Sequence, residues 1–221
     1  MHIPDGFINL PASAGFGAAA AGGVWYGLRR SAASLDDLRI PLAGLLAAFV
    51  FAAQMVNFPV AGGTSGHLLG GVLAAVLIGP WLGATVITVV LVVQAFFFAD
   101  GGLSALGLNV FNMAIIGAIG GYGVYAGLIR LLPATRSSVV GAAGVAAGMS
   151  VVLAALGFAF QYAIGGEGGA SMTTVVTAMV GVHVLIGIGE GVITALVVGA
   201  VLSARPDLVY GARRMMEVAR G

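Results

Sequence analysis

Cysteine and lysine are both absent from this chain of 221 residues, and charged residues of all kinds make up only 8% of it. Without cysteine, the chain can form no disulfide, thiolate metal site or cysteine nucleophile. Without lysine, it cannot contain the phosphate-binding loop G-x-x-x-x-G-K-S/T. We therefore expect no disulfide-stabilised fold and no binding of ATP by this chain.

Apolar residues dominate instead, at 60% of the chain, together with 37 glycines. Nine basic and eight acidic residues are too few to cover the surface of a soluble domain of this length. Glycine and alanine recur along most of the apolar runs, where they let helices pack closely in lipid. No internal repeat is visible, so the sequence predicts one transmembrane domain over residues 1–221.

The apolar runs predict an all-α integral membrane protein with about seven transmembrane helices. A helix needs roughly 20 residues to cross about 30 Å of hydrocarbon. The expected spans are residues 10–28, 40–56, 66–78, 81–98, 106–129, 139–164 and 172–202. The third is short, and 66–98 could instead be a single helix interrupted at Gly79-Pro80.

The arginines decide between these two counts. With seven spans and the N-terminus outside, every arginine falls on the cytoplasmic side, as the positive-inside rule requires. Merging the third and fourth spans would move Arg130 and Arg136 outside. The sequence therefore predicts seven spans, an extracytoplasmic N-terminus and a cytoplasmic C-terminus. The arginines concerned are Arg29, Arg30, Arg39, Arg130, Arg136, Arg205, Arg213, Arg214 and Arg220.

The opening residues MHIPDGF raise the question of why a histidine follows the chain end so closely. No basic residue precedes Arg29, so this segment is not expected to be removed as a signal peptide. His2 is too large for the aminopeptidase that removes an initial methionine. We therefore expect Met1 to remain, with a free α-amine.

The predicted topology places Met1, His2 and His67 on the same side of the membrane, where they could form a metal site. The terminal amine, the His2 backbone nitrogen and the His2 imidazole can close adjacent five- and six-membered rings on one ion. A nitrogen of His67 would complete a plane, and Gly62, Gly63 and Gly66 leave room for a close approach. Square-planar nitrogen ligation suits Ni(II) or Cu(II).

Protons should compete with a metal ion at these nitrogens. Unperturbed imidazole and α-amine groups titrate near about 6.5 and about 8. On these values, affinity should weaken as pH falls through this range, with protons released on binding.

Two alternatives to this metal site remain. The residues Gly63-Thr64-Ser65-Gly66 have the G-x-S-G form of an intramembrane serine protease, with His183 as the base. Against the protease, this pattern is weak in a chain of 37 glycines, and His2 would have no role. The second alternative is a free-standing metal channel or carrier, although few polar residues connect the outer cluster to the arginines.

Four blocks of the sequence carry a resemblance to a known family. They read MHIPDGFI, FVFAAQMVNFPVAGGTSGHLLGG, QAFFFADGGLSALGLNVFNM and HVLIGIGEGVITA. Together they resemble the membrane substrate-binding (S) component of cobalt and nickel energy-coupling factor (ECF) transporters, which are ATP-driven importers of the prokaryotic plasma (inner) membrane. MHIPDG with GTSGH is more similar to the nickel branch than to the cobalt branch.

This resemblance implies that Met1, His2 and His67 bind Ni²⁺ or Co²⁺ as the transported substrate, with nickel favoured. It implies a six-helix core into which an extra N-terminal helix inserts its tip. It also implies a transmembrane coupling (T) protein, a pair of cytoplasmic ATPases and possibly a small accessory membrane subunit, but no nucleic acid and no enzymatic reaction.

Other polar residues on the outer side or within the bilayer are expected to support the ligands or to gate the site. An acid within the bilayer should have a partner, because an unpaired one is costly there. These residues are Asp5, Asn57, Ser65, Asp100, His183 and Glu190.

Overall fold

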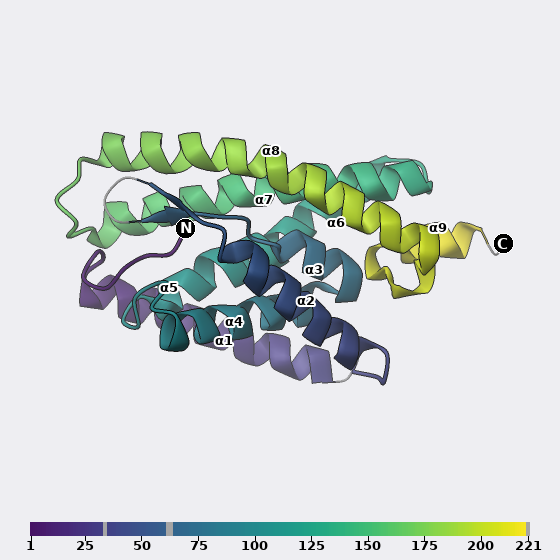
Figure 1. The fold of residues 1–221 in the computed structure, drawn as a ribbon, viewed down its shortest axis with the longest axis horizontal. Helices are drawn as coiled ribbons and strands as arrows, with labels where there is room; N and C mark the ends of the chain where they lie inside the picture. The colour runs from purple at the N-terminus through teal and green to yellow at the C-terminus, as the bar shows by residue number, and fades with distance from the viewer. Residues whose placement is uncertain (33–34, 61–63, 220–221) are drawn as a thin grey trace.

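The computed structural model describes residues 1–32, 35–60 and 64–219. Its helices run along the long axis of the molecule, as Figure 1 shows. In chain order these are α1 (Leu10–Ala32), α2 (Arg39–Gln54), α3 (Gly71–Ile78), α4 (Pro80–Phe97), the continuous run of α5 (Leu106–Val110), η2 (Phe111–Gly120) and α6 (Gly121–Leu131), α7 (Arg136–Gly165) and α8 (Met172–Ala204). The short helices η3 (Pro206–Leu208), η4 (Tyr210–Ala212) and α9 (Arg213–Val218) follow.

Each of the seven predicted segments contains a helix, which confirms the all-α membrane fold. Within the described residues, four helices are long and apolar enough to cross a membrane: Pro80–Phe97, Leu106–Leu131, Arg136–Gly165 and Met172–Ala204. Helix α2 is apolar but has only 16 residues. Seven crossings and their orientation therefore remain predictions.

The third segment differs from the helix expected over 66–78. Its helix α3 begins only at Gly71; residues 67–70 before it are not helical, and Gly70 has a φ of 73°. Strand β2 (Ser65–Gly66) pairs antiparallel with β1 (Phe58–Pro59). The eight residues of α3 rise only about 12 Å, which is too short to cross a membrane. The non-helical residues 67–70 extend the third segment further through the bundle.

Helices α3 and α4 are separate, as the seven-span prediction requires. They are joined by Gly79, whose φ of 95° lies in the region that favours glycine. Pro80 then opens α4 at a position where its missing N–H is not needed. A Cβ added at Gly83 would lie 2.7 Å from the Ala75 nitrogen, so the two helices pack at close range.

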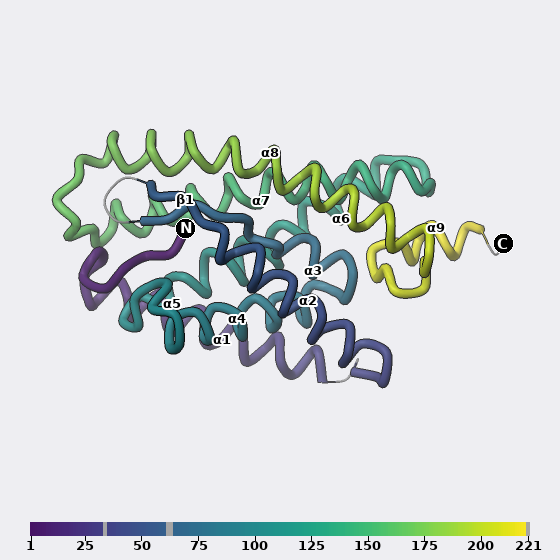
Figure 2. The backbone as a smooth tube through the Cα atoms, in the orientation of Figure 1, coloured from purple at the N-terminus to yellow at the C-terminus, as the bar shows by residue number. Residues whose placement is uncertain are grey.

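Two apolar clusters fill the bundle, one towards each end. The first surrounds the N-terminal residues and includes Met1, Ile3 and Phe158. The second includes Tyr125 and Val209 and lies beneath the C-terminal tail. The backbone in Figure 2 shows the first residues of the chain running inward among the helices, whereas the tail closes the opposite end.

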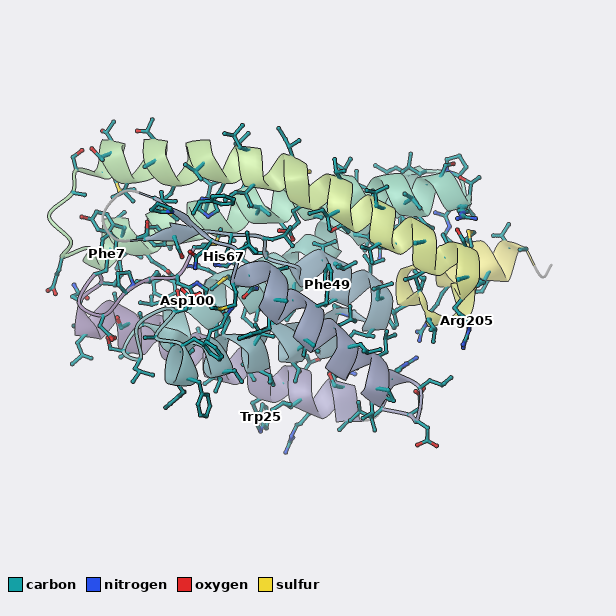
Figure 3. All side chains as sticks on the ribbon, viewed as in Figure 1. Phe7, Trp25, Phe49, His67, Asp100 and Arg205 are labelled. Carbon is teal, nitrogen blue, oxygen red and sulfur yellow. The ribbon has the colours of Figure 1, made fainter. Side chains whose placement is uncertain are left out.

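The described arginines gather at one end of this axis. The described arginines lie in the last turn of α1, begin α2, flank the connection from α6 to α7 or follow α8. All of these points lie at the end of the molecule that carries the C-terminus (Figure 1). Figure 3 shows Arg205 at that end and His67 and Asp100 towards the other. Arg220 lies outside the described residues.

Candidate metal centre

The first nine residues are not helical; residues 1–3 are buried among the helices, and Asp5 and Gly6 form an exposed turn. Met1 and Ile3 are fully buried, and His2 is 4% exposed. The side chain of Asn109 on α5 holds this segment, because its Oδ1 accepts the Ile3 N–H at 2.8 Å and its Nδ2 donates to Ile3 O at 3.3 Å. The expectation that the N-terminal tip enters the helical core is therefore confirmed.

Further contacts fix this segment at the surface. The Asp5 carboxylate accepts hydrogen bonds from Ser104 N at 2.8 Å and Ser104 Oγ at 2.5 Å. These bonds lower the pKa of Asp5, which is exposed to solvent. The Glu167 N–H donates to Phe7 O at 2.9 Å. Asp5 therefore anchors the N-terminal segment instead of contacting the nitrogens of Met1 or His2.

His67 lies in the non-helical residues 67–70 between β2 and α3. Two buried side chains hold these residues in place. Glu190 on α8 accepts the N–H groups of Leu69 at 2.5 Å and Gly70 at 2.9 Å. Gln54 at the end of α2 donates to Leu69 O at 2.8 Å. An acid within the bilayer was expected to have a partner, and Glu190 has two: the backbone N–H groups of Leu69 and Gly70, which lie just before α3.

The imidazoles of His2 and His67 come together, with ring centroids 4.6 Å apart and planes tilted by 31°. His2 Nε2 lies 3.2 Å from Gln94 Oε1, and His67 Nδ1 lies 2.8 Å from Leu68 O. Each oxygen acts as an acceptor, so it selects the tautomer that carries the proton on that nitrogen. The other nitrogens, His2 Nδ1 and His67 Nε2, are buried and make no hydrogen bond within the described structure.

The terminal amine joins these nitrogens. Met1 N donates to Ser65 O and lies 3.5 Å from Ser65 Oγ. Burial is the main cause that lowers the pKa of the Met1 amine and of the His2 imidazole below their ordinary values. Both groups are then uncharged at neutral pH, which is the form that binds a metal. At these two groups, protons therefore compete with a metal ion only at a lower pH than they would at an unperturbed amine and imidazole.

This donor set differs from an ordinary side-chain metal site. Among residues 1–32, 35–60 and 64–219, no three side chains of His, Cys, Asp or Glu gather to hold an ion. The nitrogens that converge are two imidazoles and the chain end. They can form a nitrogen cage only if the main chain contributes, and nitrogen-only ligation suits Ni(II) better than it suits Mg²⁺ or Ca²⁺.

Asp100 and Asn57 lie on the outer side of this cluster. Asp100 Oδ1 is 3.2 Å from His2 Nδ1, although the geometry is not that of a hydrogen bond. Asn57 donates to the Asp100 carboxylate. Burial raises the pKa of Asp100, while the nearby Met1 amine and Asn57 oppose this shift.

His183 and Ser65 do not form a protease dyad. His183 is fully buried, and its Nδ1 lies 2.6 Å from Met179 O one turn earlier in α8. Its Nε2 makes no hydrogen bond within the described residues, whereas Ser65 Oγ is directed towards Met1. Gly63 of the G-x-S-G pattern, like Gly62, lies outside the described residues.

The supporting amides of Gln54, Gln94 and Asn109 were not assigned to the site by sequence reasoning. All three side chains are buried, at 0%, 0% and 2% exposure. The available signal was that each is a polar residue within an apolar run. Their partners, a histidine ring or backbone groups brought in from distant parts of the chain, could not be read from that signal.

Comparisons with known proteins identify the family of this chain. The family described as the cobalt uptake substrate-specific transmembrane region matches residues 2–208. A putative metal transport protein of Haloquadratum walsbyi is 41% identical over 95% of this chain and 94% of its own length. A putative fused nickel transport protein of Archaeoglobus fulgidus is 40% identical over 95% of this chain and 68% of its own length.

A crystal structure of a truncated transition metal transporter superimposes with a TM-score of 0.84 and 32% identity, over 92% of this chain and 99% of that chain. The family and its relatives are metal transport proteins of the membrane and not enzymes, which excludes the protease alternative. The chain therefore belongs to the family of substrate-specific transmembrane regions of cobalt uptake systems.

Proposed function

We propose that this protein captures Ni²⁺, or Co²⁺ with lower preference, at the extracytoplasmic face. Four nitrogens hold the ion: the Met1 amine, the deprotonated His2 amide, His2 Nδ1 and His67 Nε2. The observation that carries the proposal is that both imidazoles are buried, that these two nitrogens make no hydrogen bond within the described residues, and that the opposite nitrogen of each ring has an acceptor. The proposal requires Met1 to be the free chain end.

The preference for nickel follows from the geometry that these donors impose. The Met1 amine and the two nitrogens of His2 can form fused chelate rings, which hold three donors close to one plane. Four nitrogens in a plane suit Ni(II), whereas Co(II) gains less from that geometry. Equilibrium competition between Ni²⁺ and Co²⁺ on the purified protein measures this preference.

The proposal extends to an energy-coupling factor importer. The chain has no lysine for a phosphate-binding loop, so ATP must act through another subunit. We infer that a transmembrane coupling protein and a pair of cytoplasmic ATPases reorient this S component and release the ion inward, with a small accessory membrane subunit as a further partner. Co-purification of an ATPase that Ni²⁺-dependent transport requires would separate this reading from a free-standing carrier.

The sharpest test adds one residue before Met1 in protein prepared without an N-terminal tag. The extension turns the Met1 amine into a peptide nitrogen and leaves every side chain in place. Removal of a partner that only supports a ligand typically costs 10–100-fold in affinity, so loss of this ligand should weaken Ni²⁺ binding by more than about a hundredfold. Calorimetric titration of the extended and unextended proteins gives the two affinities.

Matched variants complete this experiment. His67→Ala should lose most of the affinity, because it removes a ligand. Ser65→Ala should retain it, because the Met1 amine donates to the Ser65 carbonyl, which the substitution keeps. Undiminished Ni²⁺ and Co²⁺ affinity in the extended protein would refute the chelate.

A further inference from the structure

A hollow of about 230 Å³ opens beside the buried nitrogens. Its lining comes from three parts of the chain, namely the N-terminal segment, β2 and the loop between α4 and α5. The residues are His2, Pro4, Asp5, Ser65, Ala99, Asp100, Gly101 and Gly102. Asp5 and Ala99 are exposed at the surface, whereas His2 is 4% exposed, so the hollow connects the outside to the candidate site.

The loop over residues 99–102 lies directly on the N-terminal segment. A Cβ added at Gly101 would lie 3.0 Å from His2 Cδ2, and one added at Gly102 would lie 2.3 Å from Asp5 N. The Gly102 N–H donates to Ile3 O at 2.9 Å. Because this packing is tight, no ion passes to His2 between these two backbones, whereas the hollow beside them is open to the surface.

The charge of this hollow is negative. Its two ionisable side chains besides His2 are the acids Asp5 and Asp100, and the described arginines lie at the opposite end of the molecule. Asp100 is the deeper of the two, with a side chain 14% exposed and its Oδ1 3.2 Å from His2 Nδ1. Clefts lined by one sign of charge concentrate ions of the opposite sign and raise their association rates.

We propose that this hollow is the mouth through which a hydrated divalent cation reaches the site, and that Asp100 holds the ion there before the nitrogens replace its waters. The Asp100 carboxylate accepts hydrogen bonds from water molecules on the ion, so no covalent bond forms or breaks at this stage. His2 lines the same hollow and its Nδ1 lies 3.2 Å from Asp100 Oδ1, so this nitrogen is the first that the ion meets. This inference rests on the proposed function of the site.

The test measures the association rates of Ni²⁺ and Co²⁺ by stopped flow, at about 10 mM and about 1 M ionic strength, using protein with a free Met1. Asp100→Asn keeps the shape of the side chain and removes its charge. At low ionic strength it should slow association by about tenfold or more. At high ionic strength the difference should shrink, because the Debye length falls from about 30 Å to about 3 Å.

Asp100 is proposed to hold the hydrated ion before any of its waters is exchanged. Asp100→Asn should therefore slow the association of Ni²⁺ and of Co²⁺ by the same factor. Asp5→Asn should have a smaller effect, because Asp5 lies farther out and its amide counterpart can still accept the bonds of Ser104. Glu167→Gln is the matched control: it removes an exposed acid from the same face, outside the lining of the hollow, and should leave the rates unchanged.

An Asp100→Asn rate equal to that of the wild type, or one reduced equally at both ionic strengths, would overturn the proposal, since a purely structural role gives no salt dependence. If Asp100→Asn does not fold, the wild-type protein still tests the proposal. Its association rate should fall steeply as the salt concentration rises, and a rate independent of salt would overturn the proposal. Failure of the wild type to bind either ion at equilibrium would instead refute the proposed function.

Discussion

At the scale of single residues, the site is prepared by the atoms that do not face the metal. Gln94 Oε1 and Leu68 O each engage one nitrogen of an imidazole, and so they fix which nitrogen of His2 and His67 presents its lone pair. Partners of this kind orient ligating histidines and raise their basicity. In the proposed site, the orientation of the two imidazoles therefore depends on the amide of Gln94 and the carbonyl of Leu68.

The pH dependence of binding follows from the same residues. Burial lowers the pKa of the Met1 amine and the His2 imidazole, so neither group carries a proton that must leave near pH 7. The His2 amide alone must then lose a proton. The logarithm of the Ni²⁺ affinity should rise by about one for each pH unit between pH 6 and 8.

Calorimetric titrations at several pH values, repeated in buffers of different ionisation enthalpy, measure this slope and the number of protons released. If both groups kept their unperturbed values of about 8 and about 6.5, the slope would approach two or more in the lower half of this range. Such a slope would show that the buried amine is protonated in the metal-free protein.

At the scale of secondary-structure elements, α3 is unusual in that its start lies inside the bundle. No side chain of its own caps it, and its first residue, Gly71, is fully buried. Unpaired backbone groups are costly at such a place. The Glu190 carboxylate on α8 accepts the N–H groups of Leu69 and Gly70. The same residue therefore stabilises the start of α3 and positions the nearby His67.

Replacing Glu190 tests this role. Glu190→Ala leaves two buried N–H groups without a partner, and each costs about 1–3 kcal/mol. The free energy of unfolding in detergent should fall by about 2–6 kcal/mol, and Ni²⁺ affinity should fall with it. Chemical denaturation followed by circular dichroism measures the first effect, and metal titration of the folded variant measures the second.

Thr194→Val is the matched control on the same helix. Thr194 is fully buried, and its hydroxyl makes no hydrogen bond within the described residues. The change removes an unpaired buried hydroxyl and nearly keeps the shape of the side chain, so it should not lower the free energy of unfolding. An equal loss of stability in the two variants would show that general repacking of α8, and not the two bonds to the loop, accounts for the effect of Glu190→Ala.

Much of the element pattern could be predicted from the sequence, because long apolar runs and one-sided arginines report helices and their ends directly. The start of α3 could not, because it depends on tertiary contacts: Glu190 and Gln54 hold the backbone of Leu69 in a non-helical path. Met1, His2 and His67 could be grouped from the motifs. The tautomers of both rings depend on Gln94 and Leu68, and such tertiary contacts leave no local pattern.

At the scale of the whole molecule, the structure has two chemically different ends. Asp5, Asp100 and Glu167 lie at the end that contains the candidate metal centre, and the described arginines lie at the other. Positively charged residues remain on the cytoplasmic side during insertion. An importer must also present its capture site to the outside, so charge and function require the same orientation.

This orientation can be tested with single cysteines, because the natural chain contains none and gives no background labelling. Glu167→Cys places an exposed thiol in the connection from α7 to α8, and Asp37→Cys places one in the connection from α1 to α2. A membrane-impermeant maleimide added to intact cells should label the first variant and not the second. After the membrane is permeabilised, both variants should react, which shows that both thiols are accessible. In a separate experiment, a reporter protein that is active only in the cytoplasm should be active when fused after Gly221. Labelling of the Asp37→Cys variant in intact cells would place the arginines outside, and the candidate metal centre would then face the cytoplasm, where it could not capture ions for import.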